Sequence, residues 1–370
     1  MHEITALELG VALRELKPVL EGSFLKKFYD LGDGAFRMSF HNQDGNVEVY
    51  CKLLVTLNKT SFKEEVGEAT KFAMAVRKRI EDSKVVGVYQ HGSDRIAVLE
   101  FSTREGKYRM LLEMFGKGNL VILNESGKIE LCSMQINYRE RSVRPGFDYV
   151  FPKGDSVDIY GLDDNGILEI MDKVCASKSK MIVEISRHIN IGPLYLDEII
   201  RGAGLDPKSA LSREDAARLG EAFLAFLRSL PGCRPLVYME GGSIVDYSLV
   251  ALSKYSGLER KEFDTLCEAL DEAHIGARHA MREDEAPNKE LEELNATIEK
   301  QRNLVVQFET ESVNANLTAR SIFENMNAVN AVIYYMQQNK RATIDEVRKA
   351  FPEMRIGKIN LKDKKITLEL

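Results

Sequence analysis

Apolar and polar positions alternate through most of the first 160 residues, which predicts a series of β-strands. The alternation recurs in eight segments separated by Gly-, Asp- and Asn-containing turns: Phe24–Tyr29, Phe36–Phe40, Val47–Val55, Val85–Tyr89, Ile96–Phe101, Tyr108–Met114, Leu120–Leu123 and Ile129–Cys132. Two stretches have a helical period instead. One runs from Ile4 and is expected to stop at Lys17-Pro18, because proline disfavours continuation, and the other spans residues 63–80. Strands joined by hairpins and interrupted by helices predict an α+β domain over residues 1–165, not a doubly wound one.

The pattern becomes helical throughout residues 166–232. Helices over Ile182–His188 and Leu194–Ala203 are joined by Asn190-Ile-Gly192-Pro193, and a third helix follows an N-cap at Ser212. Two helices joined by Gly-Pro are typical of a helix-hairpin-helix, whose turn presents unpaired N–H groups, at Gly192 here, to phosphate oxygens. The same pattern also fits an ordinary helical linker domain, so both interpretations stay open.

Residues 233–255 return to a strand pattern, with Leu236–Tyr238 and Ile244–Val245 as a pair that could pack back on the first domain. Residues 256–340 are expected to form a coiled-coil arm, because apolar or small residues recur at spacings of three and four from Leu291 to Met336. Such a helix would be roughly 70 Å long at ~1.5 Å per residue. Residues 341–370 predict a small tip module made of one helix and a hairpin.

Bulk composition restricts the class of protein. A chain of 370 residues with 44% hydrophobic and 29% charged residues is typical of a soluble protein of two or three domains. Its five cysteines are an odd number, lie far apart and form no CxxC pair, which argues against a disulfide framework and a zinc site. The opening MHEITALELGVALRELK lacks the pattern of a signal peptide, and no apolar run reaches about 18 residues. A cytoplasmic location without membrane contact is therefore expected.

Net charge gives an ambiguous indication of nucleic-acid binding. The chain carries −6 overall, which argues against such a partner. Positive charge is nevertheless concentrated between Tyr138 and Lys153, where four basic residues face two acidic ones, whereas Arg282–Glu293 carries six acidic residues against two basic ones.

The basic segment interleaves arginines with aromatic residues. Arg139, Arg141 and Arg144 alternate with Tyr138, Phe147, Tyr149 and Phe151. Arginine forks next to aromatic faces suit phosphate contact and base stacking. A solvated basic turn leading into a core-packed aromatic cluster is the alternative, and the residues alone do not separate the two.

The ordering Arg144-x-Gly146-x-x-Tyr149-x-x-Pro152, together with the hairpin Glu113…Gly118-Asn119-Leu-Val-Ile-Leu123, resembles the N-terminal domain of the NFACT family. These are ribosome-associated quality-control factors, called RqcH in bacteria and archaea and NEMF in animals. The resemblance covers nearly the whole chain and is of the archaeal type. It includes the opening Ile4-Thr-Ala-Leu-Glu8, the Asp94-Arg95 pair, the helical hairpin and the start of a coiled coil. The family usually has aspartate at the position of Glu8. It also continues with a second coiled-coil arm and a basic RNA-binding domain, so the chain is expected to be truncated before them.

The resemblance implies a non-enzymatic RNA-binding factor without a cofactor. Such a factor binds an obstructed large ribosomal subunit that still holds a nascent chain on transfer RNA, and it recruits tRNA for template-free extension of that chain. By resemblance, the pair Asp94 and Arg95 is required for tRNA engagement, although a lone Asp-Arg dipeptide would otherwise be a turn residue beside a surface arginine. We expect the Asp94 carboxylate to orient the Arg95 guanidinium. The expected RNA-binding residues are Glu8, Asp94, Arg95, Arg139, Arg141, Arg144, Tyr149 and Gly192. The exposed seam of the arm also suggests self-association.

Two other classes of function remain as alternatives. A β-rich domain followed by a helical hairpin also resembles formamidopyrimidine-DNA glycosylases, which attack through an N-terminal proline amine. This chain begins Met1-His2-Glu3, where Glu3 could mimic the acid next to that proline, but it has neither the proline nor the zinc-finger cysteines. The other alternative is an adhesin, since some family members have been labelled fibronectin-binding proteins. The lack of signal and anchor segments opposes it.

Metal and nucleotide-loop motifs are weak in this chain. His274 and His279 are five positions apart without a third ligand nearby, so no metal site is expected. Phe115-Gly-Lys-Gly118 lacks the Walker spacing and is expected to be a turn.

Overall fold

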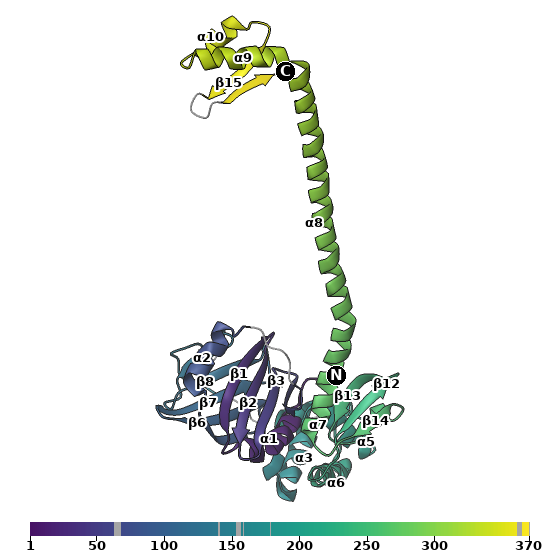
Figure 1. Ribbon diagram of the computed structural model, residues 1–370. Coiled ribbons are helices and arrows are strands. Elements are labelled where there is room, and N and C mark those ends of the chain that lie inside the picture. The colour runs from purple at the N-terminus through teal and green to yellow at the C-terminus, as the bar shows by residue number, and fades with distance from the viewer. Residues whose placement is uncertain are drawn as a thin grey trace. The chain divides into compact units, whose positions relative to one another are not determined.

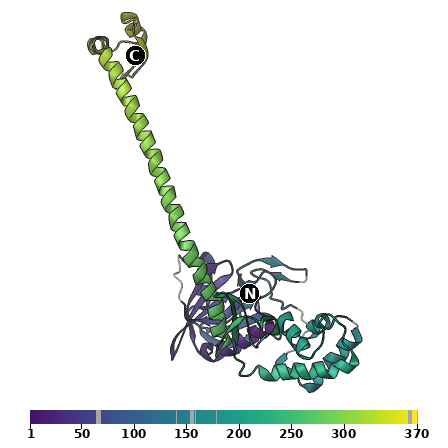
Figure 2. The same ribbon diagram turned by 90° about the vertical axis from the view of Figure 1, so that its right-hand side faces the viewer.

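The computed structural model describes residues 1–62, 68–139, 141–152, 157, 159–177, 179–360 and 365–369. The chain forms two compact units, unit 1 over Met1–Met281 and unit 2 over Arg282–Leu370. Both are seen in Figures 1 and 2.

Unit 1 is built on a nine-stranded antiparallel sheet in the order β4-β3-β2-β1-β5-β6-β7-β8-β9. Its strands are β1 (Phe24–Gly32), β2 (Ala35–Asn42), β3 (Gly45–Lys52), β4 (Thr56–Thr60), β5 (Lys84–Gln90), β6 (Ile96–Thr103), β7 (Gly106–Glu113), β8 (Asn119–Leu123) and β9 (Ile129–Cys132). The α+β architecture with antiparallel strands is confirmed. One strand prediction is wrong at its end: Val47–Val55 is expected to be a single strand, but β3 ends at Lys52 and the chain turns at Leu54, whose φ is 71°, before β4 begins at Thr56.

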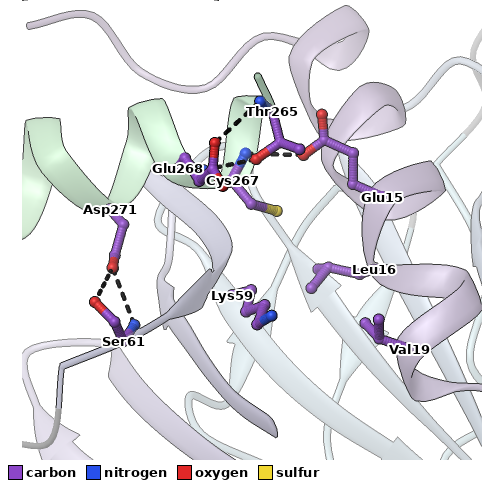
Figure 3. Close-up of a pocket in the computed structure, with 9 residues that line it drawn as sticks. All are labelled: Glu15, Leu16, Val19, Lys59, Ser61, Thr265, Cys267, Glu268 and Asp271. Carbon is purple, nitrogen blue, oxygen red and sulfur yellow. Dashed lines mark hydrogen bonds between the residues drawn. The ribbon is translucent and has the colours of Figure 1, made fainter. Parts of the chain in front are cut away.

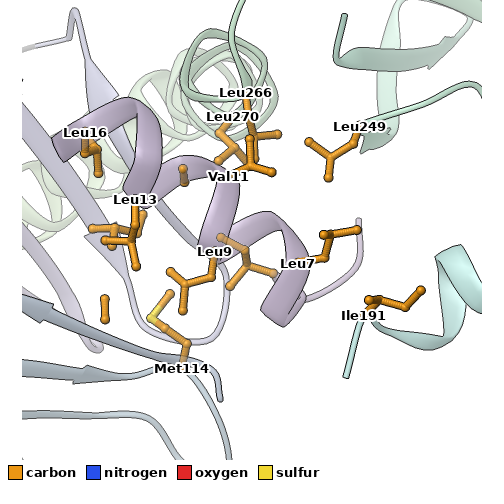
Figure 4. Packing of buried hydrophobic residues seen from close by; sticks show 14 of the residues in the cluster. Leu7, Leu9, Val11, Leu13, Leu16, Met114, Ile191, Leu249, Leu266 and Leu270 are labelled. Carbon is orange, nitrogen blue, oxygen red and sulfur yellow. The ribbon is translucent and has the colours of Figure 1, made fainter. Parts of the chain in front are cut away.

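Helix α1 (Ala6–Leu20) lies at the centre of unit 1. Thr5 and Glu8 form a capping box at its start. Its apolar side chains lie between Met114, next to the sheet, and the segments that carry Ile191 and Leu249 (Figure 4). The predicted stop at Lys17-Pro18 is wrong, because Pro18 occurs in the last turn, where its missing N–H removes one helical bond only.

Helix α2 (Lys71–Ile80) is shorter than predicted. It begins after Thr70, whose hydroxyl accepts the Ala73 N–H, so a start at residue 63 is wrong. Residues 63–67 of the predicted helix lie outside the described residues.

The rest of unit 1 combines helices with short strands. The helices are α3 (Asp164–Ser177), α4 (Met181–His188), α5 (Pro193–Gly202), α6 (Arg213–Ser229) and α7 (Leu266–Asp271). A separate three-stranded sheet has the order β13-β12-β14, with β12 at Leu236–Glu240, β13 at Ser243–Ser248 and β14 at Glu259–Glu262. Two-residue strands β10 (Ile136–Asn137) and β11 (Ser142–Val143) pair with each other. Residues 256–276, predicted to start the arm, instead contain β14, α7 and a π-helical turn at Glu272–Gly276.

Two acidic side chains connect α7 to α1 and to Ser61, just after β4. Glu15 on α1 accepts the backbone N–H groups of Leu266 and Cys267, each at 2.8 Å, at the start of α7. Figure 3 shows Glu15 beside Cys267. Asp271 at the end of α7 accepts the Ser61 N–H and hydroxyl, each at 3.0 Å. A cavity of about 370 Å³ lies between these residues, but its Glu15 and Asp271 carboxylates are used by these structural contacts.

Unit 2 consists of most of helix α8 (Ala277–Glu324) followed by a small module. The module contains α9 (Met326–Gln338), α10 (Ile344–Ala350) and a hairpin of β15 (Arg355–Asn360) and β16 (Lys365–Glu369). Val332, Ala342, Val347 and Ile356 form its core. The predicted helix and hairpin of the tip are confirmed. The uninterrupted helix predicted to Met336 is wrong, because the chain turns at Asn325 between α8 and α9.

Helix α8 exposes the apolar positions of its heptad pattern. Leu294, Val305 and Phe308 are 59%, 54% and 60% exposed. Covering such a seam favours association by ~25 cal/mol per Å² of apolar area. We expect micromolar self-association of the chain, weakened by the polar seam positions Gln301 and Ser312. Sedimentation equilibrium over a concentration series tests this, and a strictly monomeric mass at high concentration with the helix intact would contradict it.

Candidate nucleic-acid interface

The β5–β6 turn, the α4–α5 turn and the N-terminal segment meet at one place in unit 1. Asn190 in the α4–α5 turn donates from its side-chain amide to the Ser93 carbonyl at 2.8 Å. Gln90 bridges from β5 to the Ala6 carbonyl at 2.8 Å and to the Asp94 carbonyl at 2.9 Å. Two predicted sites that are about 100 residues apart, Asp94-Arg95 and Gly192, are thereby brought to a shared junction with the start of the chain.

Arg95 is oriented by the N-terminal segment. Its guanidinium lies 2.8 Å from the Glu3 carboxylate, and the same nitrogen is 3.4 Å from the Ile4 carbonyl. The expected orientation of Arg95 by Asp94 is wrong: no described residue forms an ion pair or side-chain hydrogen bond with the Asp94 carboxylate. Half-burial of that carboxylate raises its pKa. The two side chains are therefore separate features of the turn, and the Asp94 carboxylate is available to a partner.

Gly192 is required by close packing as well as by backbone conformation. Its φ is 90°, and a Cβ at this position would lie 2.6 Å from the Thr5 methyl carbon. Pro193 follows at the first position of α5, and no side chain caps that helix. The N-terminus of α5 is therefore held against the start of α1, and no side chain of the described residues caps its backbone N–H groups.

The arginine-aromatic segment divides into internal and exposed residues. The Arg141 guanidinium is 2.7 Å from the Glu113 carboxylate, which also accepts the Tyr149 hydroxyl at 2.6 Å. Burial and Glu113 raise the pKa of Tyr149. Arg141 and Tyr149 thus hold the described part of this segment against the sheet, where Cys132, Tyr138, Tyr149 and Phe151 pack on a second apolar cluster. Arg139 and Arg144 are exposed and have no charged partner among the described residues.

An aromatic stack connects this segment to the Asp94 turn. The Phe151 ring lies 3.6 Å from the His91 ring, centroid to centroid, and meets Tyr149 edge to face at 5.0 Å. The turn that carries Asp94 and Arg95 is therefore in contact both with the arginine-aromatic segment and with the α4–α5 turn.

Glu8, which was predicted to contact RNA, is fully buried below this junction. Its carboxylate accepts the Tyr195 hydroxyl from α5 at 2.6 Å and the Thr5 N–H at 2.8 Å. The His2 Nε2 lies 2.9 Å from the same carboxylate, while its Nδ1 lies 2.7 Å from Asp246 on β13. This position makes Glu8 an internal support that joins α1, α5 and β13, because it has no surface to offer a ligand.

The charge state of His2 follows from its two carboxylate partners. Burial alone would lower the pKa of His2, but hydrogen bonds to Asp246 and Glu8 outweigh it and raise the pKa to about 9. Burial alone would raise the pKa of Asp246. Its hydrogen bonds with His2 and Tyr255 outweigh burial and hold that pKa well below the usual range. His2 is therefore a cation at neutral pH that bridges two buried anions.

Little of this buried network is predictable from the local sequence. The Thr5-x-x-Glu8 spacing is a capping-box signature and could have indicated that Glu8 is turned inward. No local pattern connects His2 with Asp246, 244 residues later.

Stability should depend on pH with a maximum near 6.5. The His2 contribution is complete below its unfolded pKa of 6.5 and is lost as pH rises towards 9, which corresponds to on the order of 3 kcal/mol. His274 is buried, and its Nε2 has no partner in the described part of the chain. Burial lowers the pKa of His274 to about 4, so stability also falls as pH decreases from 6.5. Urea unfolding followed by circular dichroism measures both limbs.

Two variants test which histidine causes the loss of stability on each side of pH 6.5. His2→Gln should flatten the limb above pH 6.5, and His274→Gln should flatten the limb below it. If neither substitution changed its limb, other groups would control the pH dependence.

Neither a metal centre nor a membrane span is found among the described residues. No group of three or more His, Cys, Asp or Glu side chains there is placed to hold a metal ion. None of the helices in those ranges has the length and apolar character needed to cross a membrane.

Comparison with known proteins shows one consistent family. The NFACT N-terminal and middle domains match residues 6–369. The archaeal Rqc2 homolog aRqcH of Methanocaldococcus jannaschii is 24% identical over 352 residues, which are 91% of this chain and 52% of that protein. Subunit 2 of the ribosome quality control complex of Saccharomyces cerevisiae is 34% identical over 147 residues, 38% of this chain and 14% of that protein. The chain thus spans about half the length of the archaeal relative.

Solved structures show a similar fold. A fibrinogen binding protein from Staphylococcus aureus matches with a TM-score of 0.60 and 19% identity, covering 73% of this chain and 98% of that one. The N-terminal part of the fibronectin/fibrinogen-binding protein of Streptococcus suis matches with a TM-score of 0.57 and 17% identity, covering 72% and 97% of the two chains. Formamidopyrimidine-DNA glycosylases also occur among the matches, at TM-scores below 0.5, such as 0.33 for the Lactococcus lactis enzyme.

Proposed function

Because this chain belongs to the family of NFACT N-terminal and middle domains, we propose that it is a non-enzymatic RNA-binding factor of ribosome-associated quality control. It binds a large ribosomal subunit obstructed by a nascent chain on tRNA, and it recruits tRNA for template-free extension of that chain. The relatives named as ribosome quality control proteins in archaea and yeast support this role. The peptidyl-transfer chemistry belongs to the ribosome.

The observation that carries the tRNA part of the proposal is the junction of Asp94, Arg95 and Gly192. One half-exposed guanidinium, one carboxylate without a side-chain partner among the described residues and one helix N-terminus without a side-chain cap lie together there. Guanidinium and helix N–H groups contact phosphate oxygens, whereas a carboxylate accepts hydrogen bonds from base amino groups. The junction therefore offers contacts both to the backbone and to the bases of a folded RNA.

Arg139 and Arg144 are exposed in the segment that the Phe151–His91 stack joins to the Asp94 turn, and a test by salt dependence shows whether they contact the RNA. Replacing each with glutamine should weaken tRNA binding and lower the slope of log K against log salt by about one per lost phosphate contact. Fluorescence anisotropy of labelled tRNA at several salt concentrations measures the slope.

Arg141→Gln serves as the matched comparison. It removes the internal partner of Glu113, so it should lower thermal stability without a matching change in slope. If Arg139→Gln and Arg144→Gln left the slope unchanged, these arginines would not contact the RNA.

The glycosylase alternative has a direct test. An enzyme of that kind forms a Schiff base, which borohydride traps as a covalent adduct with damaged duplex DNA. We expect no adduct, since the N-terminal segment of this chain has no proline and its His2 ring is held between Glu8 and Asp246.

A further inference from the structure

Three tight turns of the large sheet enclose a cavity of about 610 Å³ in unit 1, here called the turn pocket. They are the β1–β2 turn at Gly32–Gly34, the β3–β4 turn at Lys52–Val55 and the β7–β8 turn at Lys117–Gly118. A volume of this size lies within the range of small-ligand sites, which is roughly 300–1,000 Å³. Neither the sequence patterns nor the junction described above accounts for it.

The walls of the turn pocket are fixed by close backbone packing. Gly118 has a φ of 71°, and a Cβ there would lie 2.8 Å from the Leu53 Cβ, so only glycine allows these two turns to meet. The Leu53 N–H donates to the Gly34 carbonyl at 2.9 Å, and the Ile4 N–H donates to the Leu54 carbonyl at 3.1 Å. Contacts between turns that are distant in sequence therefore form the pocket without a ligand.

The groups that remain available in the pocket are apolar side chains and lysines. Phe72 is half-buried and Met134 is 42% exposed, and both line the pocket. Lys117 is exposed and has no partner among the described residues, while the Lys52 ammonium donates to the Asp33 carbonyl. Apolar and aromatic surface can cover a base, and lysine ammonium groups at the same opening can contact its phosphate.

Most of the acidic groups in the pocket are occupied. Asp30 accepts the Gly32 N–H at 3.1 Å and the Thr70 hydroxyl at 2.8 Å. Glu3 pairs with Arg95. Asp33 is the exception: it is exposed and has no described side-chain partner, so its charge opposes an anion there.

Glu3 also places the turn pocket beside the RNA surface. Its carboxylate lines the pocket and binds Arg95, which belongs to the proposed tRNA junction. We infer that the turn pocket takes one unstacked nucleotide of the bound RNA, with its base between Phe72 and Met134 and its phosphate near Lys117 and Lys52. This inference rests on the proposed function for the identity of the RNA, but the pocket chemistry can be tested without it.

Adenosine 5′-monophosphate is the probe for the pocket alone, titrated into the 370-residue chain and followed by NMR or calorimetry. We expect a Kd on the order of 1 mM, as for a small fragment of a larger ligand. Ribose 5-phosphate should bind about tenfold more weakly, because the base supplies the apolar contact. Equal binding of the two compounds, or no binding of either, would overturn the inference.

Three substitutions test the position of the phosphate. Lys117→Glu should weaken binding of adenosine 5′-monophosphate and of tRNA by about tenfold and reduce the salt slope for tRNA by about one. Asp33→Asn should strengthen both by about two- to threefold, since asparagine tolerates the φ of 49° at that turn. Lys84→Glu, an exposed lysine of β5 outside the pocket, is the control and should change neither affinity by more than about twofold.

The outcomes distinguish this inference from the proposed function. If tRNA binding depends on Asp94 and Arg95 but is unaffected by Lys117→Glu and Asp33→Asn, the pocket inference is wrong and the proposed function stands. If the chain binds no tRNA, yet binds adenosine 5′-monophosphate with the expected response to both substitutions, the pocket is correct and the proposed function is wrong.

Discussion

Glu8→Ala should lower the free energy of unfolding by about 3–5 kcal/mol, a large part of the stability of an ordinary domain. The substitution leaves the Tyr195 hydroxyl without its acceptor and removes one of the two carboxylates that hold the His2 cation. It also removes half of the capping box of α1. Urea unfolding at pH 6.5, followed by circular dichroism, measures the change.

Conservative variants show whether charge or shape is responsible. Glu8→Gln keeps the volume and one acceptor but loses the charge, so it should retain Tyr195 packing and return the pKa of His2 towards its ordinary value. Glu8→Asp keeps the charge but shortens the side chain, so its loss of stability should lie between that of Gln and that of Ala. A change below about 1 kcal/mol for Glu8→Ala would show that the buried network does not support the fold.

The stability of the Glu8 variants also decides how a loss of tRNA binding in them is interpreted. Because Glu8 has no exposed surface, we expect tRNA binding by Glu8→Gln to fall only to the extent that the junction of Gly192 with Thr5 is disturbed. A loss of tRNA binding with full stability retained would instead indicate that the carboxylate becomes exposed when RNA binds.

Replacing Asp94 and Arg95 together with alanine should reduce tRNA affinity by about 10- to 100-fold with little loss of stability. Arg95 is half-exposed, its ion pair is with the exposed Glu3, and the Asp94 carboxylate has no described internal partner, so the fold loses little. A guanidinium that contacts a base or phosphate typically contributes about 1–3 kcal/mol to binding. Anisotropy with labelled tRNA gives the affinity, and thermal unfolding gives the stability.

A matched control exists in two other turns. Asp44→Ala with Arg104→Ala removes one exposed acid and one exposed base, as the test variant does, from turns outside the junction. Equal weakening of tRNA binding by both double variants would indicate a general charge effect and contradict the assignment of Asp94 and Arg95. The single variants add a further check, because without mutual contact between the two side chains their effects should be approximately additive.

Much of the fold could be predicted because the spacing of hydrophobic residues along the chain differs between helices and strands. Most of the strands from Phe24 to Cys132, and the helices that start near Ile182, Leu194 and Ser212, were predicted close to their observed positions. Three of the errors occurred where a single residue overrides the period: Leu54 turns the chain with a positive φ, Pro18 is tolerated in a last helical turn, and Asn325 interrupts the helix despite a continuous heptad pattern.

The site was less predictable because its contacts are long-range. A run of arginines and aromatic residues does not reveal that Arg141 is neutralised by Glu113 while Arg139 and Arg144 remain exposed. Likewise, the Glu3–Arg95 pair and the His2–Asp246 bond connect residues 92 and 244 positions apart. Only the fold shows that Asp94 and Arg95 share a junction with Gly192 and that Glu8 lies beneath it.

Co-sedimentation with ribosomal subunits tests the central proposal most directly. Lysate is prepared from cells in which translation has been stalled, and the native protein is followed across a sucrose gradient. We expect it to sediment with large subunits that still carry peptidyl-tRNA, and to leave that fraction when puromycin releases the nascent chains. Sedimentation with vacant and obstructed large subunits alike, or absence from both, would contradict a role in ribosome-associated quality control.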